Sequence, residues 1–184
     1  MIKPDIVAFT KVALPGGFLQ NMSPHPVEFG GREWRTTEAL FQALRFCDMV
    51  NGEPKLNPDG SLVPNRPDIV TNIWRQKSPM AAKMVTKSVR DQMVVQPLSR
   101  QDMGNMRLAL RLKVEQHPEL ARLLDETGEA VLIEDCSNRM GGSGLFWGAA
   151  LMPWGRWLGE NHLGKLWMEL RATRRATVNL TEGS

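Results

Sequence analysis

The segment Ile133–Arg171 reads IEDCSNRMGGSGLFWGAALMPWGRWLGENHLGKLWMELR. Its short apolar run ends at two adjacent carboxylates and leads into a polar, glycine-rich loop that carries an amide, a guanidinium and an indole. Loops on a rigid scaffold often carry the chemistry of a protein. This set of groups predicts a site for a sugar, a phosphate and a flat base, and the alternative is a surface turn with a core tryptophan. The residues concerned are Asp135, Asn138, Arg139, Trp147 and Gly148.

Three further blocks precede this segment. They are FLQN at 18–21 continued by TEALFQA at 37–43, SPMAAKM at 78–84, and NMRLALRLKVEQHPELARLLDETG at 105–128. In this order, the four blocks resemble the NADAR family, which is also called YbiA-like. Members of that family are reported to cleave N-glycosidic bonds of ribosylated and ADP-ribosylated compounds. The resemblance covers a core from about residue 18 to residue 171.

The resemblance implies an N-glycosidase that hydrolyses a ribosylated or ADP-ribosylated, nucleobase-like substrate. ADP-ribosyl-guanine in DNA, free ADP-ribose derivatives and riboflavin-pathway intermediates all fit, so the expected partner is a small ribosyl compound or an ADP-ribosylated nucleic acid. The alternative is a non-catalytic module that binds ADP-ribose or a nucleotide. The family places its key glutamate at Glu38 and often has lysine where this chain has Arg45. No role that needs a neutral amine is expected at Arg45, because arginine stays charged.

Length and composition set modest bounds. The chain has 184 residues, a net charge of +3 and two cysteines far from any CxxC spacing. This length suits one domain, and the charge is compatible with a phosphate-bearing ligand. No stretch approaches about 20 apolar residues and the start lacks a signal-peptide pattern, so we expect a soluble, cytoplasmic protein without a membrane partner. The three histidines are widely separated and no nucleotide-loop motif occurs, so neither a metal nor a cofactor is expected.

Hydrophobic spacing and turn residues predict a mostly α-helical α+β fold, a single YbiA-like domain over residues 1–184 with a small antiparallel sheet. Prolines and a Pro-Asp-Gly turn make 51–67 a loop insertion, either a surface loop or a lid. Arginines at 171, 174 and 175 are expected at the negative end of the last helix. Strands are expected at 6–11, 27–29, 32–34 and 131–133, the last paired with 146–151. Helices are expected from 37, from 79, from 102 or 105 to 116, from 119 to 126, and from 162.

One narrow polar line runs along the helix expected from residue 37. Glu38, Gln42 and Arg45 recur at i, i+4 and i+7, and apolar residues cover the rest of the circumference. Such a line either meets solvent as a thin strip or lines an internal pocket. The resemblance favours the pocket, with Glu38 as the catalytic group and Gln42 and Arg45 as substrate-binding groups.

A basic line recurs on the next expected helix at Lys83, Lys87 and Arg90. Such a line is typical of a solvated face, and a phosphate contact is predicted only for Lys83, which lies in a family-like block. Met80 and Met84, on the opposite face, are expected to fill the core.

Cleavage of an N-glycosidic bond passes through an oxocarbenium-like transition state, which a carboxylate beneath the anomeric carbon stabilises. Glu38 is the predicted carboxylate, and Asp135 is either a second acid/base or a structural hydrogen-bond acceptor. A covalent alternative has a desolvated Lys83 attack the anomeric carbon to form a Schiff base. The predicted substrate contacts are Trp147, Gly148 and Asn138 for the base, Arg139 and Lys83 for phosphate, and Asn21 for the ribose hydroxyls.

Overall fold

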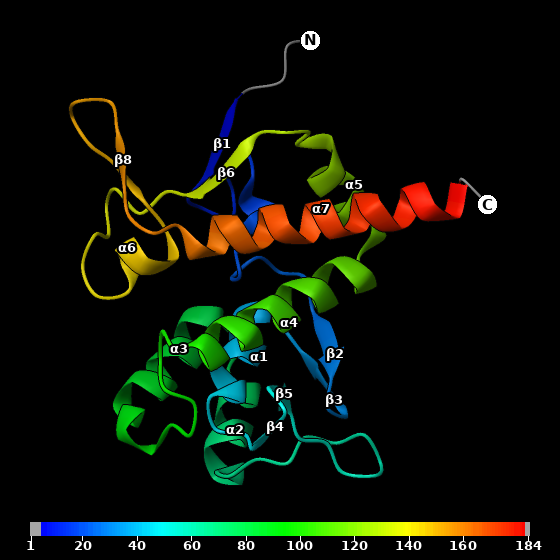
Figure 1. The fold of residues 1–184 in the computed structure, drawn as a ribbon. Coiled ribbons are helices and arrows are strands. Elements are labelled where there is room, and N and C mark those ends of the chain that lie inside the picture. Colours follow the sequence, from blue (N-terminus) through cyan, green and yellow to red (C-terminus); the bar gives the residue numbers. More distant parts are fainter. Residues whose placement is uncertain (1–4, 183–184) are drawn as a thin grey trace. The chain divides into compact units, whose positions relative to one another are not determined.

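The computed structural model describes residues 5–182, which form an α+β fold made mostly of helices (Figure 1). The chain folds into two compact units. One comprises the residues up to Gln20 and from His117 onward, and the other is Asn21–Gln116. Each unit combines helices with two-stranded sheets. Among residues 5–182, no helix has both the length and the apolar character needed to cross a bilayer.

The unit Asn21–Gln116 contains the predicted antiparallel hairpin of β2 (Val27–Phe29) and β3 (Arg32–Trp34). Gly30 and Gly31 form its turn with φ angles of 62° and 73°. Glycine adopts this left-handed conformation without strain, which is why a Gly-Gly pair suits a two-residue hairpin turn.

Helix α1 (Thr37–Leu44) is buried along its whole length. Its N-cap is Thr36, whose hydroxyl accepts a hydrogen bond of 3.2 Å from the backbone N–H of Ala39 and so satisfies one free donor of the first turn. Three helices of the same unit pack against α1, which explains its burial. They are α2 (Pro67–Arg75), α3 (Pro79–Ser88) and α4 (Arg100–Gln116).

Two helix starts differ from the expectations. Helix α2 is not among the expected helices, although Pro67 at its first position and the apolar residues Ile69, Val70 and Ile73 at helical spacing are signals of an amphipathic helix. Helix α4 begins at Arg100, two residues before the earliest expected start. Its first turn is capped by Ser99, whose hydroxyl accepts from the backbone N–H of Asp102 at 3.2 Å. The expected start of α3 is confirmed, since Ser78 accepts from Ala81 N at 3.1 Å.

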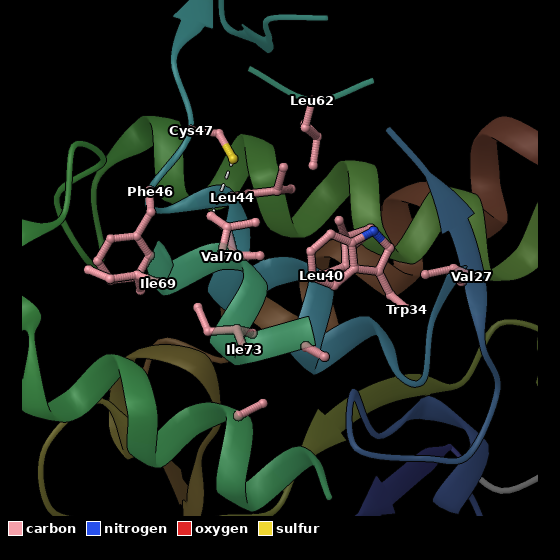
Figure 2. Close-up of a cluster of buried hydrophobic side chains, with 14 of the residues drawn as sticks. Val27, Trp34, Leu40, Leu44, Phe46, Cys47, Leu62, Ile69, Val70 and Ile73 are labelled. Atoms are coloured by element: carbon pink, nitrogen blue, oxygen red, sulfur yellow. Dashed lines mark hydrogen bonds between the residues drawn. The ribbon is translucent and has the colours of Figure 1, made fainter. Parts of the chain in front are cut away.

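Figure 2 shows the core of this unit, where apolar side chains of the β2–β3 hairpin, α1 and α2 meet. Trp34, Phe46 and Ile73 are completely buried there. Burying one side chain of this size stabilises the fold by about 1.5–3 kcal/mol. Cys47 also belongs to this core, and burial raises the pKa of its thiol to about 12. A thiol in this environment is unreactive.

The segment 51–67 is free of helix before Pro67, as predicted, and it is held by short β pairings. Strands β4 (Met49–Val50) and β5 (Glu53–Pro54) form a hairpin. Farther along, the backbone N–H of Leu62 donates to the carbonyl of Gly30 at 3.2 Å, which fastens the segment to the β2–β3 turn. A lid role for this segment stays a prediction. The short helix η2 (Arg90–Gln92) precedes α4.

In the other unit, β1 (Ile6–Phe9) pairs in parallel with β6 (Val131–Glu134), and the two lie side by side in Figure 1. The expected pairing of 131–133 with 146–151 is therefore wrong: Phe146 and Trp147 lie in a short helix, and the bridge to this stretch joins Asp135, beyond the expected strand, to Ala149. Parallel strands are joined through long crossovers, so their pairing leaves no local pattern in the sequence. The remaining elements are η1 (Gly17–Leu19), α6 (Gly144–Trp147), β7 (Ala150–Leu151) and β8 (Trp157–Leu158).

Helix α5 (Pro118–Glu126) is packed against the long helix α7 (His162–Glu182). The arginines expected at the end of α7 lie in its middle instead, so that expectation is wrong. They donate hydrogen bonds to the turn 125–130 at the end of α5, where carbonyl groups lack partners within their own helix. The three residues are Arg171, Arg174 and Arg175.

Candidate active site

The polar line of α1 is internal. Glu38, Gln42 and Arg45 are 6%, 2% and 8% exposed. The Gln42 amide donates to Glu38 Oε1 at 2.9 Å, and Gln42 Oε1 accepts from Arg45 Nη1 at 3.0 Å. The Thr86 hydroxyl of α3 lies 2.7 Å from Gln42 Oε1 and 2.8 Å from the backbone carbonyl oxygen of Lys83, and these two acceptors share its one proton. The amide of Gln42 is therefore fixed in one orientation, with its NH₂ group toward Glu38.

Arg45 is anchored by a carboxylate on α4. Its guanidinium donates to both oxygens of Asp102, from Nε at 2.8 Å and from Nη2 at 2.7 Å. Asp102 is fully buried and also accepts from the backbone N–H of Leu98 at 2.8 Å. A buried pair with this geometry is stable only when its members satisfy each other. Asp102 thus holds Arg45, Arg45 holds Gln42, and Gln42 orients Glu38.

Lys83 approaches this chain of hydrogen bonds from α3. Its Nζ lies 4.0 Å from Glu38 Oε1, and its side chain is 45% exposed, against 7% for Glu38. The lysine is therefore open to solvent while it faces the glutamate. The methionines expected to fill the core opposite it are instead exposed, Met80 at 55% and Met84 at 54%. Ala82 and Thr86 form the buried face of α3.

Asn21 lies at the start of α1, next to Glu38. Its backbone carbonyl accepts from Glu38 N and from the Thr37 hydroxyl, both at 3.0 Å. Its side-chain nitrogen contacts Met106 Sδ at 3.1 Å. Its side-chain oxygen is buried and has no hydrogen-bond partner within the described part of the chain. Buried amide oxygens are normally bonded, so this oxygen is an exception and a candidate acceptor for a ligand hydroxyl.

A fully buried lysine fixes the loop that carries Asn21. Lys113 of α4 donates from Nζ to Ser23 Oγ at 2.6 Å, and the same hydroxyl lies 3.0 Å from His25 Nδ1. Burial lowers the pKa of Lys113 to about 7, because desolvation disfavours the ammonium form. Ser23 is two residues from Asn21, so Lys113 ties the position of this loop to α4.

In the other unit, Asp135 organises the turn that follows β6. Its Oδ1 accepts from the backbone N–H and the hydroxyl of Ser137, at 2.8 and 2.5 Å. The Ser137 hydroxyl accepts in turn from Leu151 N at 2.9 Å. These bonds match the structural alternative for Asp135, and an acid/base role stays a prediction.

The two polar residues after this turn are exposed. Asn138 lies on the surface, and Arg139 donates from Nη2 to Glu134 Oε1 at 3.1 Å. The neighbouring thiol of Cys136 has a pKa raised mainly by burial and further by the charge of Glu134. A raised pKa disfavours the thiolate, so Cys136 is a poor nucleophile.

Trp147 and Gly148 are both buried. The Trp147 ring packs edge to face on Phe146, with ring centroids 5.1 Å apart. At Gly148 an added Cβ would lie 2.3 Å from the carbonyl oxygen of Glu134. Close packing against β6 therefore requires a glycine at this position, whatever its role toward a substrate. The side chain of Asn161, the residue before α7, bonds to the backbone of β6 at Glu134 N and Leu132 O.

A NADAR domain model matches residues 7–175. The chain belongs to the NADAR domain family. It is 31% identical to N-glycosidase YbiA of Escherichia coli over 171 residues, which are 93% of this chain and 89% of YbiA. N-glycosidase Npun_R5314 of Nostoc punctiforme is 26% identical over 176 residues, 95% of this chain and 96% of that protein. Riboflavin biosynthesis protein PYRR, chloroplastic, of Zea mays is 29% identical over 184 residues, but the match spans only 26% of PYRR.

The NMR structure of E. coli YbiA resembles the structure of this NADAR protein. The TM-score is 0.65 at 30% sequence identity, and the match covers 98% of this chain and 90% of the other. The family model and this match confirm the predicted family and the predicted α+β class.

Within Asn21–Gln116, the NADAR protein brings five predicted residues into one region around α1: Asn21, Glu38, Gln42, Arg45 and Lys83. The other five, from Asp135 to Gly148, follow β6 in the other unit. Asp102 and Lys113 are buried polar residues that the sequence pattern did not single out. They share one face of α4 with Met106 and Ala109 at i, i+4, i+7 and i+11. Two charged residues on an otherwise apolar stripe are the signal that identifies them.

Proposed function

We propose that this NADAR protein is an N-glycosidase that hydrolyses the bond between a ribosyl or ADP-ribosyl group and a nucleobase-like amine. The observation that carries the proposal is the environment of Glu38. Its carboxylate is almost buried, is oriented by Gln42 and has the Lys83 ammonium 4.0 Å away. Two relatives that match nearly the whole chain and are named N-glycosidases support the same activity.

The proposed reaction has Glu38 act on the anomeric carbon. The carbon–nitrogen bond breaks, its electron pair leaves with the base, and positive charge develops on the sugar ring. The fixed carboxylate stabilises that charge and accepts a proton from the attacking water, whose oxygen bonds to the anomeric carbon. The departing base nitrogen takes up a proton from solvent, and Glu38 returns its proton to solvent, so that the products are the free base and the sugar hydroxyl. Gln42 contributes by holding the carboxylate in one orientation. A catalytic group that is already oriented does not have to reorganise during the reaction, which lowers the activation free energy.

Asn21 is proposed to bind the ribose. Its buried side-chain oxygen, without a partner in the described chain, can accept a hydrogen bond from a sugar hydroxyl. Its backbone carbonyl is bonded to the N–H of Glu38, so ribose bound at Asn21 is placed near the carboxylate.

Lys83 is proposed to contact a phosphate of the substrate. Its half-exposed side chain and its distance of 4.0 Å from a carboxylate describe a solvated, paired ammonium. A covalent role needs a neutral, desolvated amine. A half-exposed lysine beside a carboxylate does not offer that environment. Direct attack by water is therefore the preferred mechanism.

The loop after β6 is proposed to supply further substrate contacts from Asn138, Arg139 and Trp147. The exposed amide of Asn138 and the guanidinium of Arg139 suit a base edge and a phosphate, respectively. Trp147 is proposed to stack on the base, and this stacking makes the base a better leaving group. Each of these roles is tested by substitution, with substrate affinity as the readout.

The experiment that tests the proposal is incubation of the protein with three candidate substrates, followed by chromatography of the released base. The substrates are a ribosylated riboflavin-pathway intermediate, a free ADP-ribose derivative and ADP-ribosyl-guanine in single-stranded DNA. We expect the wild-type protein to release base from one of these substrates, and we expect a Glu38→Gln protein to release none. Tight binding of all three without any release would overturn the proposal and favour a non-catalytic ADP-ribose-binding module.

A further inference from the structure

A groove of about 630 Å³ lies on the unit Asn21–Gln116, between helix α4 and the turn of the β4–β5 hairpin. The hairpin contributes Gly52 and Glu53. Gln101 joins the two walls, because its amide donates to the carbonyl of Gly52 at 3.0 Å. Both walls of the groove therefore belong to ordered elements that are bonded to each other.

Three arginines of α4 line this groove: Arg100, Arg107 and Arg111. A helix turns 100° and rises 1.5 Å per residue, so the three lie on one face at intervals of roughly 10.5 and 6 Å along its axis. The same geometry puts Asp102 and Lys113 on the opposite, buried face. The groove is thus separate from the hydrogen bonds that orient Glu38.

Gly104 also lines the groove, on the same face of α4 as the three arginines. A Cβ at this position would meet only the Gln101 amide nitrogen, at 3.8 Å. Glycine in a helix interior costs about 0.5–1 kcal/mol relative to alanine, and no close packing here requires it. Its effect is to leave open space beside three guanidinium groups.

The charges and shapes of the lining groups define the ligand. Glu53 is the one carboxylate of the lining, against three arginines. Guanidinium groups bind phosphate oxygens in pairs, and they do so more specifically than ammonium groups. None of the described residues that line the groove is aromatic, so it offers no stacking surface for a base. Recognition must therefore act on phosphates rather than on bases.

We propose that this groove binds a chain of phosphate groups through Arg100, Arg107 and Arg111. The shared chemistry is a series of phosphates several ångströms apart, as in polyphosphates and in the backbone of a single-stranded nucleic acid. This site goes beyond the proposed glycosidase activity. Its test measures binding and needs no turnover, so the two proposals fail independently.

The test uses two probes with the full-length protein, at 50 and at 200 mM salt. Calorimetry measures binding of inorganic tripolyphosphate, and fluorescence anisotropy measures binding of a labelled, mixed-sequence 12-nucleotide DNA strand. Three phosphate contacts predict that the affinity for the strand falls roughly 20-fold over this fourfold increase in salt. Binding of tripolyphosphate alone assigns the site to phosphoanhydrides, and binding of the strand assigns it to phosphodiesters. Both outcomes support the proposal.

The chain offers a matched control for the arginines. Arg111 is 4.0 Å from Glu115 and Arg122 is 3.9 Å from Glu126, each an exposed i,i+4 pair on a helix. Arg111→Gln and Arg122→Gln therefore remove the same charge from the same kind of pair, but only Arg111 lines the groove. We expect Arg111→Gln to weaken binding by about tenfold, and Arg122→Gln to leave it nearly unchanged.

A second variant tests the shape of the groove without changing charge. Gly104→Leu places a side chain in the groove, and its Cβ would meet only the Gln101 amide nitrogen, at 3.8 Å. We expect it to abolish binding while circular dichroism shows a folded protein. The proposal is overturned if neither probe binds at 50 mM salt, if the two arginine variants weaken binding equally, or if folded Gly104→Leu binds like wild type.

Discussion

The guanidinium of Arg45 and the carboxylate of Asp102 form two parallel hydrogen bonds, of 2.8 and 2.7 Å, across 57 positions of sequence. Asp102 is completely buried and Arg45 is 8% exposed. The pair links α1 to α4 and fixes the side chain that orients Glu38. The proposed reactive carboxylate therefore depends on an ion pair that does not touch it.

Asp102→Ala is expected to destabilise the protein strongly. Removing one partner leaves the Arg45 charge buried and unpaired, which typically costs about 3–5 kcal/mol of unfolding free energy. Urea unfolding followed by circular dichroism measures the loss. The control is Asp68→Ala, which breaks the exposed pair with Arg66 and should leave the midpoint near that of wild type. Equal midpoints for both variants would contradict the importance of the buried pair.

The free energy of unfolding is expected to rise with pH between 7 and 9, because of Lys113. The pKa of this lysine is about 7 in the folded protein and about 10.5 when solvated. Between these values the unfolded chain binds more protons than the folded one, so raising the pH stabilises the fold. One such group contributes up to about 1.4 kcal/mol per pH unit, and below pH 7 its contribution no longer changes.

Lys113→Met isolates this effect, since it keeps the length of the side chain and removes the titrating group. Denaturation midpoints measured at pH 7, 8 and 9 should rise less steeply in the variant than in wild type. The series stops at pH 9 because the raised pKa of Cys47 acts in the opposite direction at higher pH. Parallel pH profiles for the two proteins would contradict a buried, titrating Lys113.

Local patterns in the sequence predict much of this fold. The Gly30-Gly31 hairpin, the serine cap of α3 and the end of α4 at Gln116 all follow from neighbouring residues, and the structure confirms them. The parallel pairing of β1 with β6 depends on residues more than 120 positions apart. No nearby pattern encodes such a pairing.

The candidate site shows the same division. Glu38, Gln42 and Arg45 are visible as a polar line in sequence, but their burial and their partner Asp102 depend on how α4 packs. Met80 and Met84 are expected in the core on the assumption that they lie opposite the basic line of α3, whereas the packing of α3 buries Ala82 and Thr86 and leaves both methionines exposed. A sequence shows which side chains lie on each face of a helix. It does not show which other element packs against that face.

Trp147 is expected to contribute to substrate binding. If it stacks on the base, Trp147→Ala raises KM by an amount equivalent to about 1–3 kcal/mol, the usual range for base–aromatic stacking. The ring is 9% exposed and packs on Phe146, so the Tm of the variant must be measured as well. A large drop in Tm with an unchanged KM in the folded fraction would assign Trp147 to the core alone.

Lys83 is expected to bind phosphate without forming a covalent bond. Borohydride added during turnover reduces any Schiff base to a stable adduct, which peptide mass spectrometry detects. We expect no adduct. We also expect Lys83→Met to weaken the binding of phosphate-bearing substrates and to leave the binding of substrates without phosphate unchanged. Lys87→Met, an exposed lysine of the same helix, is the control. An adduct on Lys83 would replace direct attack by water with covalent catalysis.

The most direct test of the central claim is kcat of Glu38→Gln on the substrate from which wild type releases base. The substitution keeps the shape and an oxygen that accepts from Gln42, and it removes the negative charge. We expect kcat to fall by about 10²–10⁴, with a Tm close to that of wild type and with Glu115→Gln fully active as the control. A folded Glu38→Gln protein that retains the wild-type kcat would remove Glu38 from the mechanism.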